Sequence, residues 1–307
     1  MRSVAIIGAG AMGCLFAARL SEAGADVTVV DVDEDRLAAL AAQGIAFTDD
    51  GGSRTVRVRA ARAVDVPGPV DLVILFTKAM HSAGALASVA HLRRFRPIAL
   101  TLQNGIGNAE LLADAFDAAR VLMGTAVIPA DLTDARSVST SGFASLQIGT
   151  FDGTDRDHFA AVADLLARAR FAVHRHPQVA VAMWEKLAFN AALNAVGMIC
   201  QVTNAGIDNQ PGRRIASAVV DETASVAAAK GLALDRDAVL AQIDAALREH
   251  GGHKASMLQD REARRRSEIE AINGAIAAEG GRAGVPTPVC DTLSDLVRII
   301  EASIGLA

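Results

Sequence analysis

Three polar residues interrupt an otherwise apolar stretch, Ala182–Val196. Lys186, Asn190 and Asn194 recur at every fourth position, so in a helix they lie one above another on a single face. The remainder of the stretch is apolar nearly all round, which predicts a buried helix. Burying an amine and two carboxamides is costly unless they find hydrogen-bond partners. A cleft filled by substrate or water would provide partners, and a structural network within the helical region is the alternative interpretation.

Six consecutive residues match the glycine pattern G-x-G-x-x-G, namely Gly8, Ala9, Gly10, Ala11, Met12 and Gly13. They follow the apolar run Val4–Ile7 and open a stretch with helical spacing, the context typical of dinucleotide binding. Gly8 permits a tight turn, Gly10 lets a pyrophosphate approach the backbone, and Gly13 lets helix and strand pack closely. The free N–H groups at the start of the helix favour phosphate there. A glycine turn in an unrelated α/β fold is the alternative.

Asp31 ends the second predicted strand, at the distance where an acidic residue commonly contacts the ribose hydroxyls. A carboxylate at this position favours NAD and repels the 2′-phosphate of NADP. Arg36, five residues further on, could instead contact that phosphate. Asp31 could also simply cap the helix that begins near Asp33. The sequence therefore favours NAD and leaves NADP open.

Two further polar residues follow predicted strands directly. Lys78 comes after the strand that ends at Phe76, and Asn104 comes after the strand that ends at Leu102. Ligands of open α/β sheets bind at the carboxyl ends of parallel strands, so both positions are candidate cofactor contacts. An ordinary Asn-Gly turn and a surface lysine are the alternatives.

Two serines match the capping-box pattern, in Ser256-x-x-Gln259 and Ser267-x-x-Glu270. Both are predicted to begin helices, which places Ser256 and Glu268 at neighbouring helix N-termini. For Ser256, capping and ligand contact are both open. The arginine run 264–266 between them is interpreted as solvated surface. No third ligand accompanies the histidines at 250 and 253, so no metal site is expected.

The elements that would carry these residues alternate between strand and helix in the first half of the chain. Strands are predicted at Val4–Gly8, Val27–Val30, Val70–Phe76, Pro97–Leu102, Val121–Gly124, Ala144–Gly149 and Phe171–His174. Helices are predicted at Ala11–Ala23, Asp33–Gln43, Ala109–Ala118 and Asp155–Ala169. Such alternation indicates an α/β fold with a doubly wound Rossmann sheet. We assign residues 1–177 to this domain.

After Pro177 no strand pattern is found, and the remaining stretches all have helical spacing. They are Val181–Cys200, Arg213–Lys230, Asp235–Glu249, Ser256–Arg264, Glu268–Ala278 and Pro288–Ile304. Residues 178–307 are therefore assigned to an all-α C-terminal domain that carries the substrate and catalytic residues.

The bulk composition is that of an ordinary globular protein of 307 residues, with a net charge of −5 and both signs well mixed. This balance does not indicate a nucleic-acid surface. The three cysteines are far apart and form neither a disulfide framework nor a zinc signature, which fits a reducing compartment. No apolar run could span a membrane, and no signal peptide is indicated. We expect a cytoplasmic protein with a small-molecule partner, and monomer and homodimer are both open.

Motifs spread over almost the whole chain resemble, in the same order, the ketopantoate reductase (2-dehydropantoate 2-reductase) family. They are Gly8–Gly13, Thr77-Lys78-Ala79, Gln103-Asn104-Gly105, Trp184–Asn190, Ser256–Asp260 continuing to Ser267–Gly274, and Gly284–Pro288. None of them is specific alone, but the set is. The resemblance implies hydride transfer from NAD(P)H to the 2-keto group of ketopantoate, giving pantoate for pantothenate and coenzyme A biosynthesis.

The resemblance also implies roles for particular residues. It implies that Lys186 is catalytic and that Lys78, Asn104 and Glu268 lie at the cofactor, the last of them near the nicotinamide. The implied substrate ligands are Asn190, Asn194, Asn204 and Ser256. Lys186 would act as proton donor, with a pKa lowered toward neutrality by partial burial.

Three positions depart from the family pattern. Asp31 stands where most members have a basic residue and bind NADP, and His253 and Cys290 stand where asparagine is common. The last two leave open a related dehydrogenase for another small 2-keto or hydroxy acid. A non-catalytic dinucleotide sensor is the remaining alternative, but a sensor would not need the polar stripe that begins at Lys186.

Overall fold

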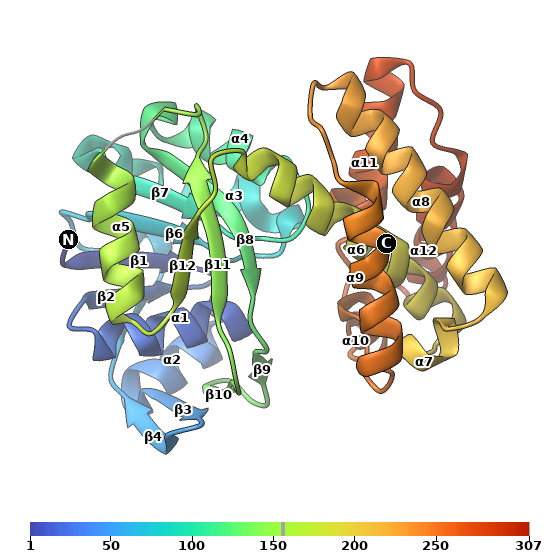
Figure 1. The fold of residues 1–307 in the computed structure, drawn as a ribbon. Coiled ribbons are helices and arrows are strands. Elements are labelled where there is room, and N and C mark those ends of the chain that lie inside the picture. The colour runs from blue at the N-terminus through green and yellow to red at the C-terminus, as the bar shows by residue number, and fades with distance from the viewer. Residues whose placement is uncertain (155–156, 307) are drawn as a thin grey trace. The chain divides into compact units, whose positions relative to one another are not determined.

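The chain forms two compact units, seen in a computed structural model that describes residues 1–154 and 157–306. The first unit comprises Met1–Gln103 and Asn108–Val179, and the second comprises Asn104–Gly107 and the residues from Ala180 onward. The first is an α/β unit and the second is helical (Figure 1). The predicted fold class, a Rossmann domain followed by an all-α domain, is confirmed.

An eight-stranded sheet forms the centre of the α/β unit, in the order β12-β11-β8-β7-β6-β1-β2-β5. Its strands are β1 (Ser3–Ile7), β2 (Asp26–Val30), β5 (Arg59–Ala61), β6 (Leu72–Leu75), β7 (Ile98–Thr101), β8 (Val121–Val127), β11 (Ser145–Thr150) and β12 (Ala172–Arg175). Neighbouring strands are parallel except at the β8–β11 pair. The carboxyl ends of β1, β2, β6 and β7 therefore lie along one edge.

Side chains of the first strand alternate between two apolar cores, because successive residues of a strand point to opposite faces. Val4 and Ile6 belong to the core shared with α1 and α5, whereas Ala5 and Ile7 belong to the core shared with α3 and α4. The helices of this unit are α1 (Ala11–Glu22), α2 (Glu34–Gln43), α3 (Ser82–Ser88), α4 (Asn108–Ala115) and α5 (Asp157–Arg168). Short 3-10 helices lie at η1 (Ala63–Asp65), η2 (Ala79–His81), η3 (Ala90–Phe95) and η4 (Ala118–Arg120).

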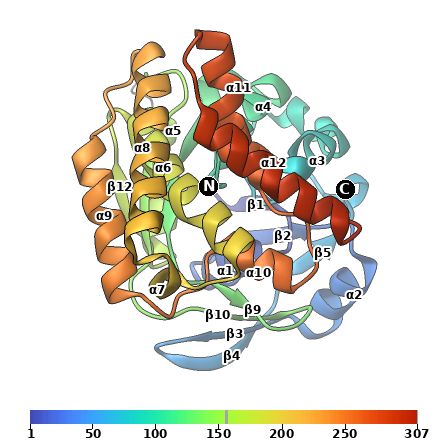
Figure 2. The same ribbon diagram turned by 90° about the vertical axis from the view of Figure 1, so that its right-hand side faces the viewer.

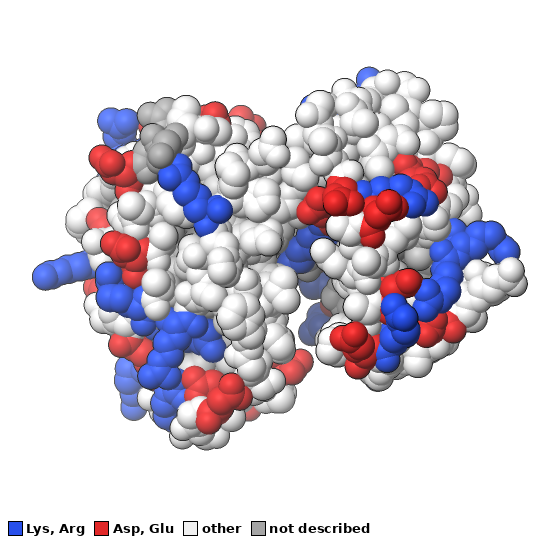
Figure 3. All heavy atoms as spheres, in the orientation of Figure 1, with Lys and Arg blue, Asp and Glu red and all other residues white. Residues whose placement is uncertain are grey.

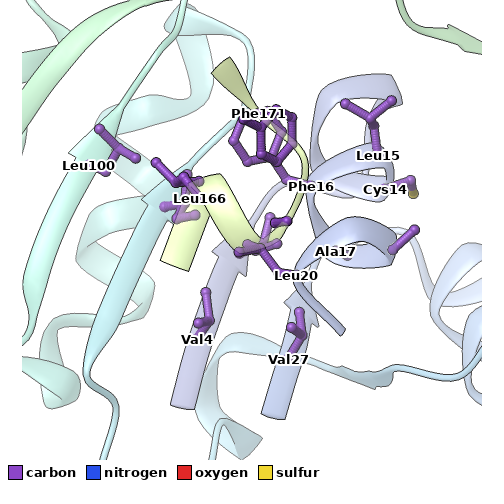
Figure 4. Close-up of a cluster of buried hydrophobic side chains, with 14 of the residues drawn as sticks. Val4, Cys14, Leu15, Phe16, Ala17, Leu20, Val27, Leu100, Leu166 and Phe171 are labelled. Atoms are coloured by element: carbon purple, nitrogen blue, oxygen red, sulfur yellow. The ribbon is translucent and has the colours of Figure 1, made fainter. Parts of the chain in front are cut away.

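The core beneath α1 is closed by a pair of aromatic rings (Figure 4). Phe16 of α1 stacks on Phe171, with ring centroids 4.3 Å apart. Leu20 and Leu166 complete this cluster from α1 and α5. The packing fixes α1, and with it the loop that precedes the helix. The predicted start of α5 at Asp155 lies outside the described residues.

A second, four-stranded sheet, which the sequence patterns did not indicate, has the order β4-β3-β10-β9. Its strands are β3 (Ile45–Asp49), β4 (Gly52–Val56), β9 (Asp131–Leu132) and β10 (Ser137–Ser139). Asp49 pairs with Gly52, so Asp50-Gly51 forms a two-residue hairpin loop, and Asp-Gly is one of the dipeptides such loops favour.

The helical unit packs around α6, whose buried side chains share one apolar core with the other long helices. Its helices are α6 (Val179–Cys200), α7 (Asn204–Ile207), α8 (Gln210–Ala229), α9 (Arg236–Glu249), α10 (Ser256–Glu262), the 3-10 helix η5 (Ile269–Ala271), α11 (Asn273–Ala283) and α12 (Pro288–Ser303). Figure 2 shows α11 adjoining α12 and α8 beside α9. Among the described residues, no helix combines the length and apolar character needed to cross a bilayer.

Acidic and basic side chains are intermixed on the face of the helical unit that Figure 3 displays. The helical unit contains several ion pairs, such as Arg213 with Asp208 at 2.6 Å and Lys230 with Glu279 at 2.5 Å. On that face, charges of the helical unit neutralise one another instead of forming a patch of one sign.

Neither predicted capping box forms. Ala255, not Ser256, is the N-cap of α10, and the Ser256 side chain makes no cap hydrogen bond. The Glu270 carboxylate binds the Arg298 guanidinium, with two contacts of 2.7 Å, instead of returning to the backbone of Ser267. In the first box the Ser256 hydroxyl binds Asn194 instead. In the second box Ser267 Oγ still accepts the Ile269 N–H at 3.4 Å, but the reciprocal bond from Glu270 is replaced by the ion pair with Arg298.

The predicted helix Glu268–Ala278 is also wrong at its start. The chain forms the short 3-10 helix η5, and α11 begins only at Asn273. Ile272 lies between them with φ −111° and ψ −95°, which is not a helical conformation. Glu268 consequently lies in an irregular segment before α11.

Candidate functional site

The glycine loop between β1 and α1 has a backbone that requires glycine at two of its three glycine positions, Gly8 and Gly13. Gly8 has a φ of +107°, and a Cβ there would lie 2.7 Å from the Thr77 backbone nitrogen. A Cβ on Gly13 would lie 1.9 Å from the Gly8 carbonyl oxygen, so α1 can approach β1 only without a side chain there. A Cβ on Gly10 would meet nothing within 4 Å. Protein packing therefore does not require glycine at position 10, whereas close approach of a phosphate to the backbone would.

Asp31 follows β2 and holds the glycine loop. Its Oδ2 accepts the Ala9 N–H at 2.6 Å, and its Oδ1 accepts the N–H groups of Val32 and Asp33 at 2.8 and 3.1 Å. The N-cap of α2 is Asp33, which accepts the Arg36 N–H at 3.0 Å, so capping by Asp31 is excluded. The carboxylate therefore lies beside the loop, where an acidic residue meets the ribose in dinucleotide-binding folds.

The Arg36 side chain returns to the same loop. Its Nη1 donates to the Ala9 carbonyl oxygen at 3.0 Å, and its Nε lies 3.6 Å from Asp33. A guanidinium and the Asp31 carboxylate thus both contact the Ala9 peptide. The structure keeps both candidate determinants of the NAD–NADP choice at one place.

A buried polar network, which the sequence patterns did not indicate, lies at the carboxyl ends of β6 and β7. Gln103 Nε2 donates to the Thr77 carbonyl oxygen at 2.5 Å and to Ser82 Oγ at 3.0 Å. Ser82 Oγ in turn donates to Asn108 Oδ1 at 2.9 Å. The network fixes the backbone beside Lys78, which is the N-cap of η2.

The loop that carries Asn104 belongs to the helical unit although it follows a strand of the sheet. The Ile106 N–H donates to the Ala271 carbonyl oxygen at 3.2 Å. Gly105 has a φ of +83°, and a Cβ there would lie 2.4 Å from that same oxygen. The loop is thereby docked on η5, and the candidate cofactor residues Asn104 and Glu268 lie on two segments in contact.

The stripe predicted on α6 forms, because α6 is one continuous helix through Lys186, Asn190 and Asn194. Asn194 is buried, and its Nδ2 donates to Ser256 Oγ at 3.2 Å. The Lys186 and Asn190 side chains are partly exposed. The stripe is thus neither a closed core network nor a fully solvated face.

Lys186 has a strongly shifted pKa. Burial disfavours the ammonium form and lowers the pKa from 10.5 to about 8, and the negative charge of Glu268 acts in the opposite direction. A lysine with a pKa near neutrality can donate and accept protons under physiological conditions. Perturbed groups of this kind are typical of catalytic sites.

Asn204 makes its own hydrogen bonds to the backbone. It is 3% exposed, its Nδ2 donates to the Ala246 carbonyl oxygen at 3.3 Å, and its N–H donates to the His253 carbonyl oxygen at 3.1 Å. These contacts hold the end of α9 and the loop after it. The structure therefore brings Lys186 and Glu268 together and links Asn194 with Ser256. Asn204 binds the backbone of α9 and of the loop after it, and its contact with substrate stays a prediction.

Comparisons with known proteins match this chain to one family over almost its whole length. Two family models match: "Ketopantoate reductase PanE/ApbA" over residues 4–153 and its C-terminal model over residues 178–301. A 2-dehydropantoate 2-reductase of Halobacterium salinarum is 30% identical over 302 residues, 97% of this chain and 98% of the relative.

Solved structures with the same fold include a member of this family. D-mandelate dehydrogenase with NADH and anilino(oxo)acetate superposes with a TM-score of 0.94 at 28% identity, covering 99% of this chain and 100% of that one. A PanE/ApbA family ketopantoate reductase of Ralstonia eutropha superposes with a TM-score of 0.90 at 28% identity, covering 98% and 99% of the two chains. With matching family models, full-length relatives and the same fold, this chain belongs to the ketopantoate reductase family of oxidoreductases.

Proposed function

We propose that this protein reduces the 2-keto group of ketopantoate to give pantoate, a step of pantothenate and coenzyme A biosynthesis, with Lys186 as proton donor. The observation that carries the proposal is a lysine with a pKa of about 8 at one end of a polar stripe on a largely buried helix. The names of the full-length relatives support the choice of substrate.

In this reaction Lys186 would donate a proton to the carbonyl oxygen of the substrate. When bound, the nicotinamide cofactor supplies the hydride that adds to the 2-keto carbon. Negative charge then develops on the carbonyl oxygen, and a nearby cation stabilises it. With a pKa of about 8, Lys186 is mostly protonated at neutral pH and can transfer Nζ–H to that oxygen. Its lowered pKa makes the transfer easier than for an ordinary lysine.

The neighbouring residues suit binding and orientation. Glu268 raises the pKa of Lys186 by its charge and so keeps the ammonium form available. Asn190, Asn194 and Ser256 offer neutral donors and acceptors for a substrate with a carboxylate and a hydroxyl group. The Asn194–Ser256 hydrogen bond fixes the orientation of the two side chains in advance. We propose Asn204 for a supporting role, since its polar groups already hold backbone.

For the cofactor we propose NADH in preference to NADPH. The Asp31 carboxylate is held at the glycine loop, where it can accept ribose hydroxyls and repel a 2′-phosphate. A solved relative with the same fold contains NADH. Arg36 opposes this preference, because a guanidinium at the same loop could bind a phosphate.

A second candidate is reduction of a different 2-keto acid, favoured by the likeness to D-mandelate dehydrogenase. Of the two departures from the family pattern, Cys290 is fully buried in the helical core, so its effect on a substrate would be indirect. His253 is exposed, and it is the departure that could contact a substrate.

Turnover of a panel of 2-keto acids tests both candidates. Initial rates would be measured with ketopantoate, phenylglyoxylate, 2-ketoisovalerate and pyruvate, each with NADH and with NADPH. The highest kcat/KM is expected for ketopantoate with NADH. A higher kcat/KM for phenylglyoxylate would favour the second candidate over ketopantoate as the substrate. Absence of turnover with every 2-keto acid would favour a dinucleotide sensor.

A further inference from the structure

A buried carboxylate lies on the core-facing side of the last helix. Leu293, Val297 and Glu301 recur at every fourth position of α12, and all three are buried, Glu301 being 4% exposed. A carboxylate at a core position is unfavourable unless it is hydrogen-bonded, and an apolar residue of similar size would often serve stability as well. Core packing alone therefore does not explain why a glutamate occupies position 301.

Its partner is the backbone directly beside Glu268. Glu301 Oε1 accepts the Ser267 N–H at 2.7 Å, across 34 residues of sequence. Ser267 is itself 3% exposed, so the bond lies away from solvent. A charged acceptor makes such a bond shorter and stronger than a neutral one would.

The segment that this bond holds has no regular structure of its own at its ends. Arg264 has a φ of +51°, and Ile272 interrupts the chain between η5 and α11. Glu268 lies between these two residues. Its carbonyl oxygen accepts the Ala271 and Ile272 N–H groups at the start of η5, and tertiary contacts must set where this short segment as a whole lies.

A second buried hydrogen bond holds the other end of the segment. Asn273 is fully buried, and its Nδ2 donates to the Ala191 carbonyl oxygen at 3.0 Å. Ala191 belongs to α6, the helix that carries Lys186. The segment is thus tied to α12 just before Glu268 and to the lysine-bearing helix just after η5.

We propose that Glu301 and Asn273 are positioning residues, which hold the Glu268 carboxylate at a set place relative to the Lys186 ammonium group. The kinetic consequence of this inference rests on the proposed function, because it concerns the same lysine. The hydrogen bonds themselves do not. Glu268 is the charged group that acts on the pKa of Lys186. The other charged groups around the segment are Arg264, Arg266, the Arg265–Asp260 ion pair and the Arg298–Glu270 ion pair.

The proposal differs from a purely structural role in one respect. If Glu301 only satisfied a buried N–H group, its loss would lower stability and leave the titration of Lys186 unchanged. If it positions Glu268, its loss lets that carboxylate move, and Lys186 loses the charge that raises its pKa. The pKa of Lys186 must then fall further below its ordinary value.

The chain offers a direct measurement, because it contains only four lysines, Lys78, Lys186, Lys230 and Lys254. Lysine labelled with ¹³C at Cε would give four NMR signals, and Lys186→Arg would identify the signal of interest. Its pH titration in the free protein needs neither substrate nor turnover. Failure of every 2-keto acid to react would remove the proposed function and leave this test intact.

Three variants of α12 make the comparison. Glu301→Leu should lower the titration midpoint of Lys186 by about half a unit or more and lower kcat about tenfold or more. Glu301→Gln retains an oxygen that can accept the Ser267 N–H, and should keep the parent midpoint. Ser294→Ala is the matched control, because Ser294 is equally buried on the same helix and bonds only within it, to the Cys290 carbonyl oxygen.

Two outcomes would overturn the proposal. One is a folded Glu301→Leu protein in which Lys186 titrates at the parent pH. The other is a Glu301→Gln protein whose Lys186 midpoint moves as far as in Glu301→Leu. If Glu301→Leu does not fold, Asn273→Ala applies the same test from the other end of the segment, and an unchanged Lys186 midpoint there would equally overturn it.

Discussion

Two groups of charged side chains, one in each unit, are built in opposite ways. In the α/β unit, Arg54 lies between two carboxylates, with Nη1 2.7 Å from Asp49 Oδ1 and Nη2 2.8 Å from Glu22 Oε2. In the helical unit, Lys186 is half-buried and has Glu268 as an opposing charge. The first group is saturated with hydrogen bonds, and the second combines burial with a single compensating charge.

The pKa values follow from this difference. Hydrogen bonds from Arg54 hold the pKa of Asp49 at about 2 and lower that of Glu22, so both carboxylates stay ionised at any physiological pH. Burial brings the pKa of Lys186 to about 8, where a proton can leave or arrive. A charge that is paired by hydrogen bonds to opposite charges keeps one protonation state and serves structure. A half-buried charge whose desolvation is only partly offset by an opposite charge has a pKa near neutrality and can exchange a proton.

Removal of the reactive charge should have the largest effect. Lys186→Ala should lower kcat for 2-keto acid reduction by roughly two to four orders of magnitude, the usual contribution of a positioned acid–base group. NADH affinity, measured by fluorescence titration, should change little. A kcat close to that of the parent protein would show that Lys186 is not the proton donor. The distinction between a structural group in the α/β unit and a reactive group in the helical unit would then fail.

Asp31 shares features of both groups, the structural carboxylates and the reactive charges. It accepts three backbone N–H groups, as a structural carboxylate would, yet it lies where ribose binds. Asp31→Arg should shift the ratio of kcat/KM for NADH over NADPH by about tenfold or more toward NADPH, since a guanidinium can hold a phosphate with two hydrogen bonds. Arg36→Ala is the companion variant and should move the ratio toward NADH. A clear NADPH preference in the parent protein would refute the proposed cofactor.

The smallest effect is expected in the saturated group, and on stability alone. Arg54→Ala should lower the free energy of unfolding by about 1–3 kcal/mol, the range for hydrogen bonds to charged groups, and leave kcat unchanged. Because the folded pKa of Asp49 is depressed, its contribution is present above about pH 4 and is lost as the pH falls toward 2. Denaturant unfolding across that range should show a weaker pH dependence in the variant. A lowered kcat with unchanged stability would contradict this assignment.

The local features of the site could be predicted from the sequence, and the tertiary ones could not. The glycine loop and the α6 stripe are defined by spacing within one segment, and both form as expected. The hairpin of β3 and β4 was missed because β4 is polar up to Val56, although Ile45 and Phe47 alternate in β3 and Asp50-Gly51 was a usable turn signal. Ser256 does not cap α10 because the helix already begins at Ser256, with Ala255 as its N-cap, and its hydroxyl instead accepts a hydrogen bond from Asn194, 62 residues away.

The buried hydrogen bonds that hold the segment around Glu268 show the same limit. Nothing in the motif that contains Asn273 tells that its amide binds the backbone of α6. One signal was available for α12, since the spacing of Leu293, Val297 and Glu301 places a carboxylate on an apolar stripe. Its partner, the N–H of Ser267, could only be identified once the two segments were seen together.

The pH dependence of kcat/KM for the 2-keto acid, measured at saturating NADH, tests the central claim most directly. If protonated Lys186 donates the proton, kcat/KM should be constant at lower pH and decline above about pH 8. In Glu268→Gln, which lacks the charge that raises the pKa of Lys186, the decline should begin at lower pH. A profile that is flat from about pH 7 to 10, or a decline at the same pH in both proteins, would contradict the account.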